Sequence, residues 1–522
     1  RQWILMPGNS RVRYKTLIEE NKLFEQEAEH SRHNRYIDGP DKSMGIIACG
    51  LAYNYIMENF PEGCPFPVLK ISQYPLPTAL VQRMASECRS LLIVEEGQPL
   101  VEEMIRGLLG TPIPVKGRLS GELPRTGELT PDNVRGALGL PRRESEAASQ
   151  LTMPRPPALC QGCGHRDVYT ALNDVLREHY PDHKVFSDIG CYTLGSLPPF
   201  RAIDTCVEMG ASVTMAKGAA DGGQFPSVAV IGDSTFTHSG MTALLDAVNE
   251  KSNITVVISD NLTTGRSAPD WAWSPNTSAS WYPCPRTWRR SAARSAKRSN
   301  TKGFRSSSRA ASASRPPNAT TQKNSSTTMK RDIILSGVGG QGILSIATVI
   351  GAAALKEGLH IKQAEVHGMS QRGGDVQSNL RISSDEILSD LIPQGAADII
   401  ISLEPMEALR YVPYLNPEGW VIANTTPFVN IDNYPEPEAV LAELGKRKHA
   451  ILIDVDAIAK EQSSPRAANI VLLGAAAPFL GLDADKFEAG IRSIFARKGE
   501  QIVEMNLKAF RAGYEYAQKH RK

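Results

Sequence analysis

The sequence predicts an α/β protein made of several doubly wound parallel-sheet domains. Short runs that are apolar at every position, such as MGIIACGL at 44–51 and LLIVE at 91–95, alternate with longer segments of helical periodicity. Strands buried on both faces of a parallel sheet have this continuous apolar pattern. The same alternation resumes at residue 185 and again at residue 332, so we expect three α/β units within the 522 residues.

Each unit is predicted from its own strands and helices in chain order. The first has strand candidates at 44–51, 68–71 and 91–95. The second has a strand at VFSDIG, a Gly/Ala-rich helix near 211–221, a strand at VAVIGDS, a helix from about residue 239, and a strand at ITVVISDN. The third opens with DIILSGVGGQG and has later strand candidates near 361, 397–403, 420–423 and 451–455.

Composition and charge narrow the classes of protein that fit. A net charge of +2 argues against a polyanion-binding protein, and no apolar run approaches the ~18 residues of a membrane-spanning helix. We therefore expect neither nucleic acid nor membrane as a partner. Eight cysteines, all before residue 285, are too few for a disulfide scaffold. No basic-then-apolar leader follows Arg1, so we expect a cytoplasmic protein, and the initial arginine suggests a fragment or a processed chain.

One segment breaks this pattern. Between Leu262 and Ile333 there is no Ile, Leu or Val, while Ser and Arg are abundant and four of the six Trp occur there. Without branched aliphatic side chains a segment cannot bury enough surface to offset its chain entropy. We interpret 265–328 as a disordered Ser/Arg-rich linker or a frame-error segment, with a basic arm for nucleic acid as the alternative. Met329 then begins a stretch that reads like the start of another polypeptide.

The strongest chemical signal lies at the ends of two neighbouring strands of the second unit. Gly232-Asp233-Ser234 ends one apolar strand, and Asp260-Asn261 ends the next, with one crossover helix between them. Parallel strands deliver such residues to the same carboxyl edge of the sheet, where α/β folds bind ligands. Carboxylate and amide oxygens suit Mg²⁺, which completes its octahedron with diphosphate oxygens and water. The alternative is a pair of ordinary strand-end residues that cap turns.

This pattern resembles the thiamine-diphosphate motif, although Ser234 replaces its second Gly and Asp260 its first Asn. The blocks CQGCGHR, SDIGCYTLGSLPP, DTCVEMGAS and GDSTFTHSG resemble the thiamine-binding domain of the large subunit of indolepyruvate:ferredoxin oxidoreductases. Upstream, YPLP, VEEGQP and GELPRTGEL resemble the domain that precedes it. After Met329, GVGGQGI and EVHGMSQRGGDVQSNLRIS resemble the small subunit of the same enzyme.

The resemblance implies a domain organisation. Residues 1–43 would be a linker from a pyrimidine-binding domain, 44–140 a transketolase C-terminal-like domain, and 141–264 the thiamine-diphosphate-binding domain. Residues 329–522 would form the small-subunit, gamma-type domain after the 265–328 segment. The chain would thus join the C-terminal part of a large subunit to a whole small subunit, within a hetero-oligomer of the two.

The implied activity is oxidative decarboxylation of an aryl-2-oxoacid such as indolepyruvate, with coenzyme A as acyl acceptor and ferredoxin as electron acceptor. Three departures lead us to expect that this chain by itself does not complete the reaction. The family's large subunit has an N-terminal pyrimidine-binding domain, which supplies the Glu that activates the thiamine ring, and this sequence is expected to begin after it. The large subunit also carries ferredoxin-type cysteine runs that are absent here, and the match to the thiamine motif ends at about Thr264. The rival hypotheses are a non-oxidative thiamine decarboxylase and a nucleotide-binding regulatory protein.

The resemblance also implies roles for individual residues. Asp233 and Asn261 would bind Mg²⁺. His238, just past the strand end, would face the reacting centre as the catalytic residue, with an ordinary turn residue as the alternative. The small-subunit motif would line an active-site or subunit interface. Further contacts to thiamine diphosphate would come from Gly190, Cys191, Gly232, Ser234, Thr235 and Thr263, and the interface residues would be Gln341, Ser370, Gln371 and Arg372.

Two motifs leave alternatives open. Gly337, Gly339, Gly342 and Glu365 imitate a dinucleotide fingerprint, although the HGMSQRGG continuation favours the small-subunit interpretation. A zinc ribbon would need a second CxxC, and a thioredoxin-like pair would need a strand-to-helix setting. By resemblance, a [4Fe–4S] cluster is possible at Cys160, Cys163 and Cys191, with Cys284 as the one candidate for a distant fourth ligand, while Cys206 is expected to be a buried structural thiol.

Overall fold

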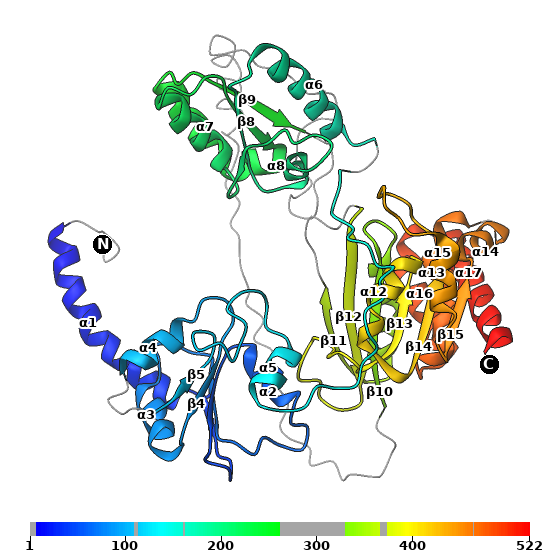
Figure 1. Cartoon of the computed structure of the whole chain (residues 1–522), viewed down its shortest axis with the longest axis horizontal. Helices are drawn as coiled ribbons and strands as arrows, with labels where there is room; N and C mark the ends of the chain where they lie inside the picture. The colour runs from blue at the N-terminus through cyan, green and yellow to red at the C-terminus, as the bar shows by residue number, and fades with distance from the viewer. Residues whose placement is uncertain are drawn as a thin grey trace.

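The computed structural model describes residues 7–108, 113–159, 162–260, 329–365, 373–462 and 464–521. These residues form three α/β bodies, each built around its own sheet (Figure 1). This confirms the predicted fold class. The segment 265–328, expected to be a linker, lies outside the described residues. None of the described helices is both long and apolar enough to cross a membrane.

The first body has a five-stranded sheet in the order β1-β3-β2-β4-β5. Its three central strands match the predicted apolar runs, and only the short edge strand β1 is antiparallel to its neighbour. A long helix, α1, precedes the sheet within the stretch expected to be a linker, and the Glu29 carboxylate accepts the N–H groups of Ala79 and Leu80 at the start of α3. The elements are α1 (Pro7–His30), β1 (Arg35–Ile37), β2 (Gly45–Cys49), α2 (Ala52–Met57), β3 (Val68–Ile71), α3 (Thr78–Glu87), β4 (Leu91–Val94), α4 (Leu100–Leu108), β5 (Val115–Lys116) and α5 (Pro131–Ala137).

The second body has a four-stranded, wholly parallel sheet in the order β7-β6-β8-β9. Residues alternate between two apolar clusters, so that Val228 and Val230 face α6 while Ala229 and Ile231 face α7 and α9. The sheet is therefore covered on both faces, as the continuous apolar strands predict. The elements are α6 (Gly164–His179), β6 (Lys184–Ser187), β7 (Thr205–Cys206), α7 (Ala211–Asp221), β8 (Ser227–Gly232), α8 (Asp233–Thr235), α9 (Met241–Asn249) and β9 (Ile254–Ser259).

The third body has a six-stranded mixed sheet in the order β11-β12-β10-β13-β14-β15. Five of its strands run in one direction, and β12 runs opposite to its neighbours β11 and β10, whereas the sequence predicts a parallel sheet. Consecutive residues of β10 face opposite layers: Ile333 packs toward the α11 side and Ile334 toward the α12 side. The elements are β10 (Lys330–Val338), α11 (Ile343–Lys356), β11 (His360–Glu365), β12 (Asp375–Ser383), β13 (Ala397–Ser402), α12 (Pro405–Arg410), β14 (Leu415–Asn424), α13 (Pro437–Leu444), β15 (Ala450–Ile453), α14 (Val455–Glu461), α15 (Ala468–Ala476), α16 (Ala484–Phe495) and α17 (Glu500–His520).

The first and third bodies are in direct contact. The Arg381 guanidinium, buried at the end of β12, pairs with Asp332 of its own sheet at 2.7 Å and with Glu58 of the first body at 2.9 Å. Gln394 donates its backbone N–H to the Asp132 carboxylate at 3.0 Å. Buried ion pairs of this kind require geometric matching, because each charge must find its partner when water is removed.

Candidate active site

The predicted strand-end residues lie at one edge of the second sheet. The ladder between β8 and β9 pairs Gly232 with Ser259, so the residues that follow, Asp233 and Asp260, leave the sheet side by side. Asp233 is the first residue of the single helical turn α8 and is partly buried. The predicted partners Asn261 and Thr263 lie outside the described residues, and their roles stay predictions.

A tyrosine ring fills the space beneath two of the predicted glycines. A Cβ on Gly190 or on Gly232 would lie 2.4 Å from Tyr192 Cε1, so either substitution would force the buried ring to move. The Tyr192 hydroxyl lies 3.0 Å from Thr235 Oγ1, and burial raises the pKa of Tyr192 to about 12. The two glycines are thus needed to admit Tyr192, which the sequence reasoning did not select.

His165 is a second residue that the sequence reasoning missed. It lies on the first turn of α6, is 2% exposed, and its Nδ1 lies 2.6 Å from Ser259 Oγ at the end of β9. Burial lowers the pKa of the His165 imidazole, and the charge of Asp233 only partly opposes this. A neutral imidazole therefore stands near the edge that carries Asp233. Its position inside CQGCGHR was the signal available in the sequence.

The loop that carries Gly190 and Cys191 is held by a buried carboxylate. Asp188 follows β6, and its side chain accepts the backbone N–H of Ser212 at 2.7 Å and the Ser212 hydroxyl at 2.6 Å. Burial raises the pKa of Asp188, while these hydrogen bonds act in the opposite direction. Thr193 donates its hydroxyl to the Asp188 carbonyl at 2.6 Å and accepts the Gly190 N–H at 3.0 Å, so the loop is preorganised.

The cysteines occupy different positions around this edge. Cys163 immediately precedes α6 and is partly buried, and Cys191 is exposed. Cys206, expected to be buried, is exposed because it ends the short edge strand β7; its Sγ lies 3.4 Å from the Asp188 carbonyl. Cys160 lies outside the described residues, within which no group of three or more His, Cys, Asp or Glu side chains is placed to bind a metal. The iron–sulfur cluster stays a prediction.

His238 lies six residues beyond the end of β8. It is exposed on the π-helical turn Phe236–Gly240, which continues α8 into α9. The neighbouring Ser239 donates its hydroxyl to the Met209 carbonyl at 2.8 Å, so this turn is tied to the start of α7. The catalytic role of His238 also stays a prediction.

Gln341 lies in the third body, at the glycine-rich turn between β10 and α11. Its side chain accepts the Val338 N–H at 2.7 Å, a contact within the turn. It also donates to the Leu403 carbonyl at 3.2 Å, which connects the turn to the end of β13. The turn lines a cavity of about 320 Å³ together with Asn424, Asp456 and Asn469. The other predicted interface residues, Ser370, Gln371 and Arg372, lie outside the described residues.

The sheet order argues against the dinucleotide alternative for this turn. In a dinucleotide fingerprint the acidic residue ends the strand next to the glycine-rich one. Here β12 lies between β10 and β11, so Glu365 ends a strand that is two positions away, roughly 10 Å at ordinary strand spacing. The fingerprint is therefore matched in sequence but not in space.

Comparisons with known proteins match the second body and the third body to two different families. The family model "Pyruvate ferredoxin/flavodoxin oxidoreductase" matches residues 332–516, and "Thiamine pyrophosphate enzyme, C-terminal TPP binding domain" matches residues 188–270. A crystal structure of the gamma subunit of a keto/oxoacid ferredoxin oxidoreductase from Geobacter sulfurreducens is 26% identical and covers 36% of this chain and 99% of that one, with a TM-score of 0.28.

Two curated relatives are similar to different halves of the chain. Indolepyruvate oxidoreductase subunit IorA of Methanothermobacter thermautotrophicus is 36% identical over 276 residues, which are 50% of this chain and 45% of the relative. The chain therefore spans less than half the length of that subunit. Subunit IorB of Archaeoglobus fulgidus is 37% identical over 198 residues, which are 36% of this chain and 96% of the relative. With an almost complete IorB sequence preceded by an IorA-like half, the chain belongs to the indolepyruvate oxidoreductase family.

Proposed function

We propose that the chain takes part in the thiamine-diphosphate-dependent oxidation of aryl-2-oxoacids such as indolepyruvate, with acyl transfer to coenzyme A and electron transfer to ferredoxin. The observation that carries this proposal is the paired ends of β8 and β9, where the register Gly232–Ser259 sets Asp233 beside Asp260. The family membership supplies the reaction class, and the relatives' names supply the substrate.

The residues at this edge fit a magnesium-bound diphosphate. Asp233 offers a carboxylate, which is a preferred ligand of a hard cation. The first residues of α8 carry helix N-terminal backbone N–H groups, which can donate to diphosphate oxygens. Gly190 and Gly232 lack the Cβ atoms that would displace the Tyr192 ring from this edge. The cofactor, when bound, supplies a nucleophilic carbon and an electron sink for decarboxylation.

The protein's own residues act by binding and orienting. Asp233 anchors the diphosphate through Mg²⁺, with Asn261 as the predicted second ligand. Tyr192, held by its contact with Thr235, forms the floor of the site. His165 keeps a neutral imidazole near this floor, which adds no positive charge to compete with Mg²⁺ for the diphosphate. His238, on the exposed turn, is the proposed group nearest the incoming substrate.

The proposal extends to partners. Ferredoxin would receive the electrons through a [4Fe–4S] cluster at Cys160, Cys163 and Cys191, and coenzyme A would receive the acyl group. The two halves would belong to a hetero-oligomer of large and small subunits in the cytoplasm. The similarity of the two halves to separately named subunits supports the assembly.

Cofactor binding tests the proposed site directly. Calorimetric titration of the purified chain with thiamine diphosphate should give saturable binding that requires Mg²⁺ and is abolished by a chelator. Binding of equal affinity with and without Mg²⁺ would contradict the site.

Product analysis separates the oxidative function from its rival. The purified chain is incubated with indolepyruvate, thiamine diphosphate, Mg²⁺, coenzyme A and a one-electron dye. Carbon dioxide released in step with dye reduction supports the proposal, whereas release of an aldehyde without dye reduction favours a non-oxidative decarboxylase. We expect turnover far below the ~1–10³ per second of a typical enzyme for the chain by itself. The iron content of the purified protein provides a second discriminator.

A further inference from the structure

An extended segment connects the two halves of the IorA-like region and lies on the IorB-like body. Residues 141–159, here called the strap, follow α5 and precede α6. Figure 1 shows this cyan segment passing along the third body before it reaches α6. Its side chains therefore come from the part similar to IorA, while the surface beneath it comes from the part similar to IorB.

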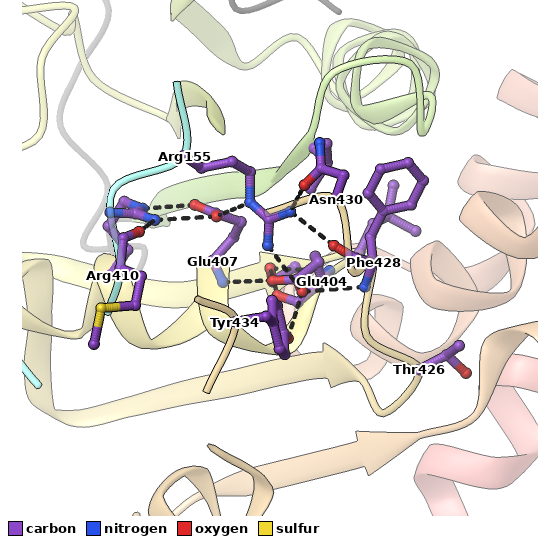
Figure 2. Close-up of polar contacts among 12 residues, drawn as sticks. Arg155, Glu404, Glu407, Arg410, Thr426, Phe428, Asn430 and Tyr434 are labelled. Carbon is purple, nitrogen blue, oxygen red and sulfur yellow. Dashed lines mark hydrogen bonds and ion pairs between the residues drawn. The ribbon is translucent and has the colours of Figure 1, made fainter. Parts of the chain in front are cut away.

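Arg155 is the centre of this contact. Its side chain is fully buried, and its Nε donates to Glu407 Oε1 at 2.8 Å while Nη2 lies 3.2 Å from Glu404 Oε1. Nη1 donates to the Phe428 carbonyl at 2.7 Å and also to the Asn430 side chain. Figure 2 shows the guanidinium enclosed by these groups, all of which belong to the third body.

Among the residues that the structure describes, the charges of this cluster balance only when the strap is present. Glu407 also pairs with Arg410, from Nε at 2.6 Å. In the described part of the third body, two buried carboxylates therefore face one arginine. Glu404 accepts from a tyrosine hydroxyl and two backbone N–H groups, but none of these described partners is a cation. Arg155 supplies the missing positive charge. A buried carboxylate without a cation is costly, so this pocket is matched to a basic side chain from outside the third body.

The rest of the strap adds apolar and polar contacts to the same body. Leu151 and Met153 pack against the apolar cluster on the α12 side of the sheet, and Arg410 donates to the Met153 carbonyl at 2.7 Å. Glu146 pairs with Arg447 at 3.0 Å. The Glu144 carbonyl lies so close to Gly395 that a Cβ there would sit 2.0 Å from it. The strap thus follows the surface of the third body from residue 144 to residue 155.

We propose that the strap is a docking element by which an IorA-type polypeptide holds an IorB-type polypeptide, with Arg155 as its anchor and the pocket of Glu404 and Glu407 as its receptor. The two partners match separately named subunits in relatives, so a contact within this chain corresponds to one between chains there. The association does not depend on the covalent connection through 265–328, nor on the proposed catalytic activity.

The test uses the full chain with a recognition sequence for a specific protease inserted within 265–328. After cleavage, sedimentation velocity over a dilution series measures the dissociation constant of the two pieces. We expect the parent pieces to stay together. Arg155→Ala should weaken their association by about a hundredfold or more, because it leaves a buried carboxylate uncompensated. Circular dichroism of the cleaved sample checks that both pieces keep their secondary structure.

Two further variants distinguish docking from a general loss of packing. Arg142→Ala removes an exposed arginine from the same strap, so the dissociation constant should change by less than about threefold. The double variant Arg155→Met with Glu404→Gln restores the charge balance. Its dissociation constant should be at least about tenfold lower than that of Arg155→Met alone.

Three outcomes would overturn the proposal. They are parent pieces that separate on cleavage, Arg155→Ala pieces that bind as tightly as the parent, and a double variant that recovers nothing. If the single variants precipitate, modification of the intact parent with phenylglyoxal decides: the buried Arg155 must stay unmodified while the exposed Arg142 reacts, and modification of Arg155 would contradict a docked strap.

Discussion

His165 Nδ1 and Ser259 Oγ lie 2.6 Å apart, so the start of α6 is joined to the carboxyl end of β9. The two residues are 94 positions apart in the sequence. Their contact brings the segment after Cys163 to the sheet edge that carries Asp233. The edge is therefore built from separate stretches of chain, among them the start of α6, the end of β8 and the end of β9. A substitution that displaces any of these stretches should weaken cofactor binding.

Asp233 is the residue on which the proposed cofactor site depends most. Asp233→Ala should abolish measurable binding of thiamine diphosphate in the presence of Mg²⁺, because it removes a hard-cation ligand and leaves diphosphate charge uncompensated. Calorimetric titration measures the loss. Asp246→Ala is the matched control, since this exposed carboxylate lies on α9 beside Lys217 and away from the edge. Unchanged affinity in Asp233→Ala would rule out the assigned site.

Because Tyr192 packs against Gly232, any side chain introduced at position 232 should destabilise the folded protein. Gly232→Ala should lower the free energy of unfolding by about 1–3 kcal/mol, because its Cβ would overlap the buried ring. Combining it with Tyr192→Leu should reverse part of the overlap. Gly218→Ala is the control: its Cβ meets nothing within 4 Å on α7, so it should stabilise by about 0.5–1 kcal/mol. Chemical unfolding followed by circular dichroism checks all three.

Asp188 predicts a pH-dependent contribution to stability. Burial raises the pKa of this carboxyl in the folded protein, so its contribution to the free energy of unfolding is fully present below the unfolded pKa of about 3.9 and declines as pH rises through the folded pKa. Asp188→Asn lacks that decline. Urea unfolding at several pH values between 3.5 and about 7 measures this. The free energy of unfolding of the variant should increase relative to that of the parent as the pH rises. A difference that is constant with pH would contradict the assignment.

The composition of 265–328 predicts where proteases act first. Limited digestion with trypsin should cut within this segment, which is rich in Arg and Lys and lacks branched aliphatic residues. Two stable products are expected, ending near its two borders, and mass spectrometry identifies them. First cuts within β10 or β13 would show that the composition has been misinterpreted.

Many of the strands and helices could be predicted from the sequence alone. The apolar runs at 68–71 and 91–95 became β3 and β4, and the helix predicted near 211–221 became α7. These elements are recognisable because a strand buried on both faces, or a helix rich in small apolar residues, carries its environment in its own composition. The placing of Asp233 at a carboxyl edge followed from the same logic.

The strand β12 was not predicted, for a physical reason. Its sequence DVQSNLRIS includes polar residues that lie buried, among them Ser378 and Arg381. They are tolerated because Asp332 and Glu58, distant in the sequence, pair with the guanidinium. The sequence by itself gave no sign of these partners, and so no sign that the strand is central or antiparallel.

The sequence alone determined the strands, the carboxyl-edge motif and the family, because each rests on residues that are close together along the chain. Only the tertiary structure decided that the Tyr192 ring fills the space beneath Gly190 and Gly232, and that His165 contacts Ser259. It also decided that Arg155 balances the charge of a pocket formed by residues more than 240 positions away in the sequence. Such contacts depend on which buried group is left without a partner once the sheets have formed. That is a property of the packed molecule and not of any local pattern.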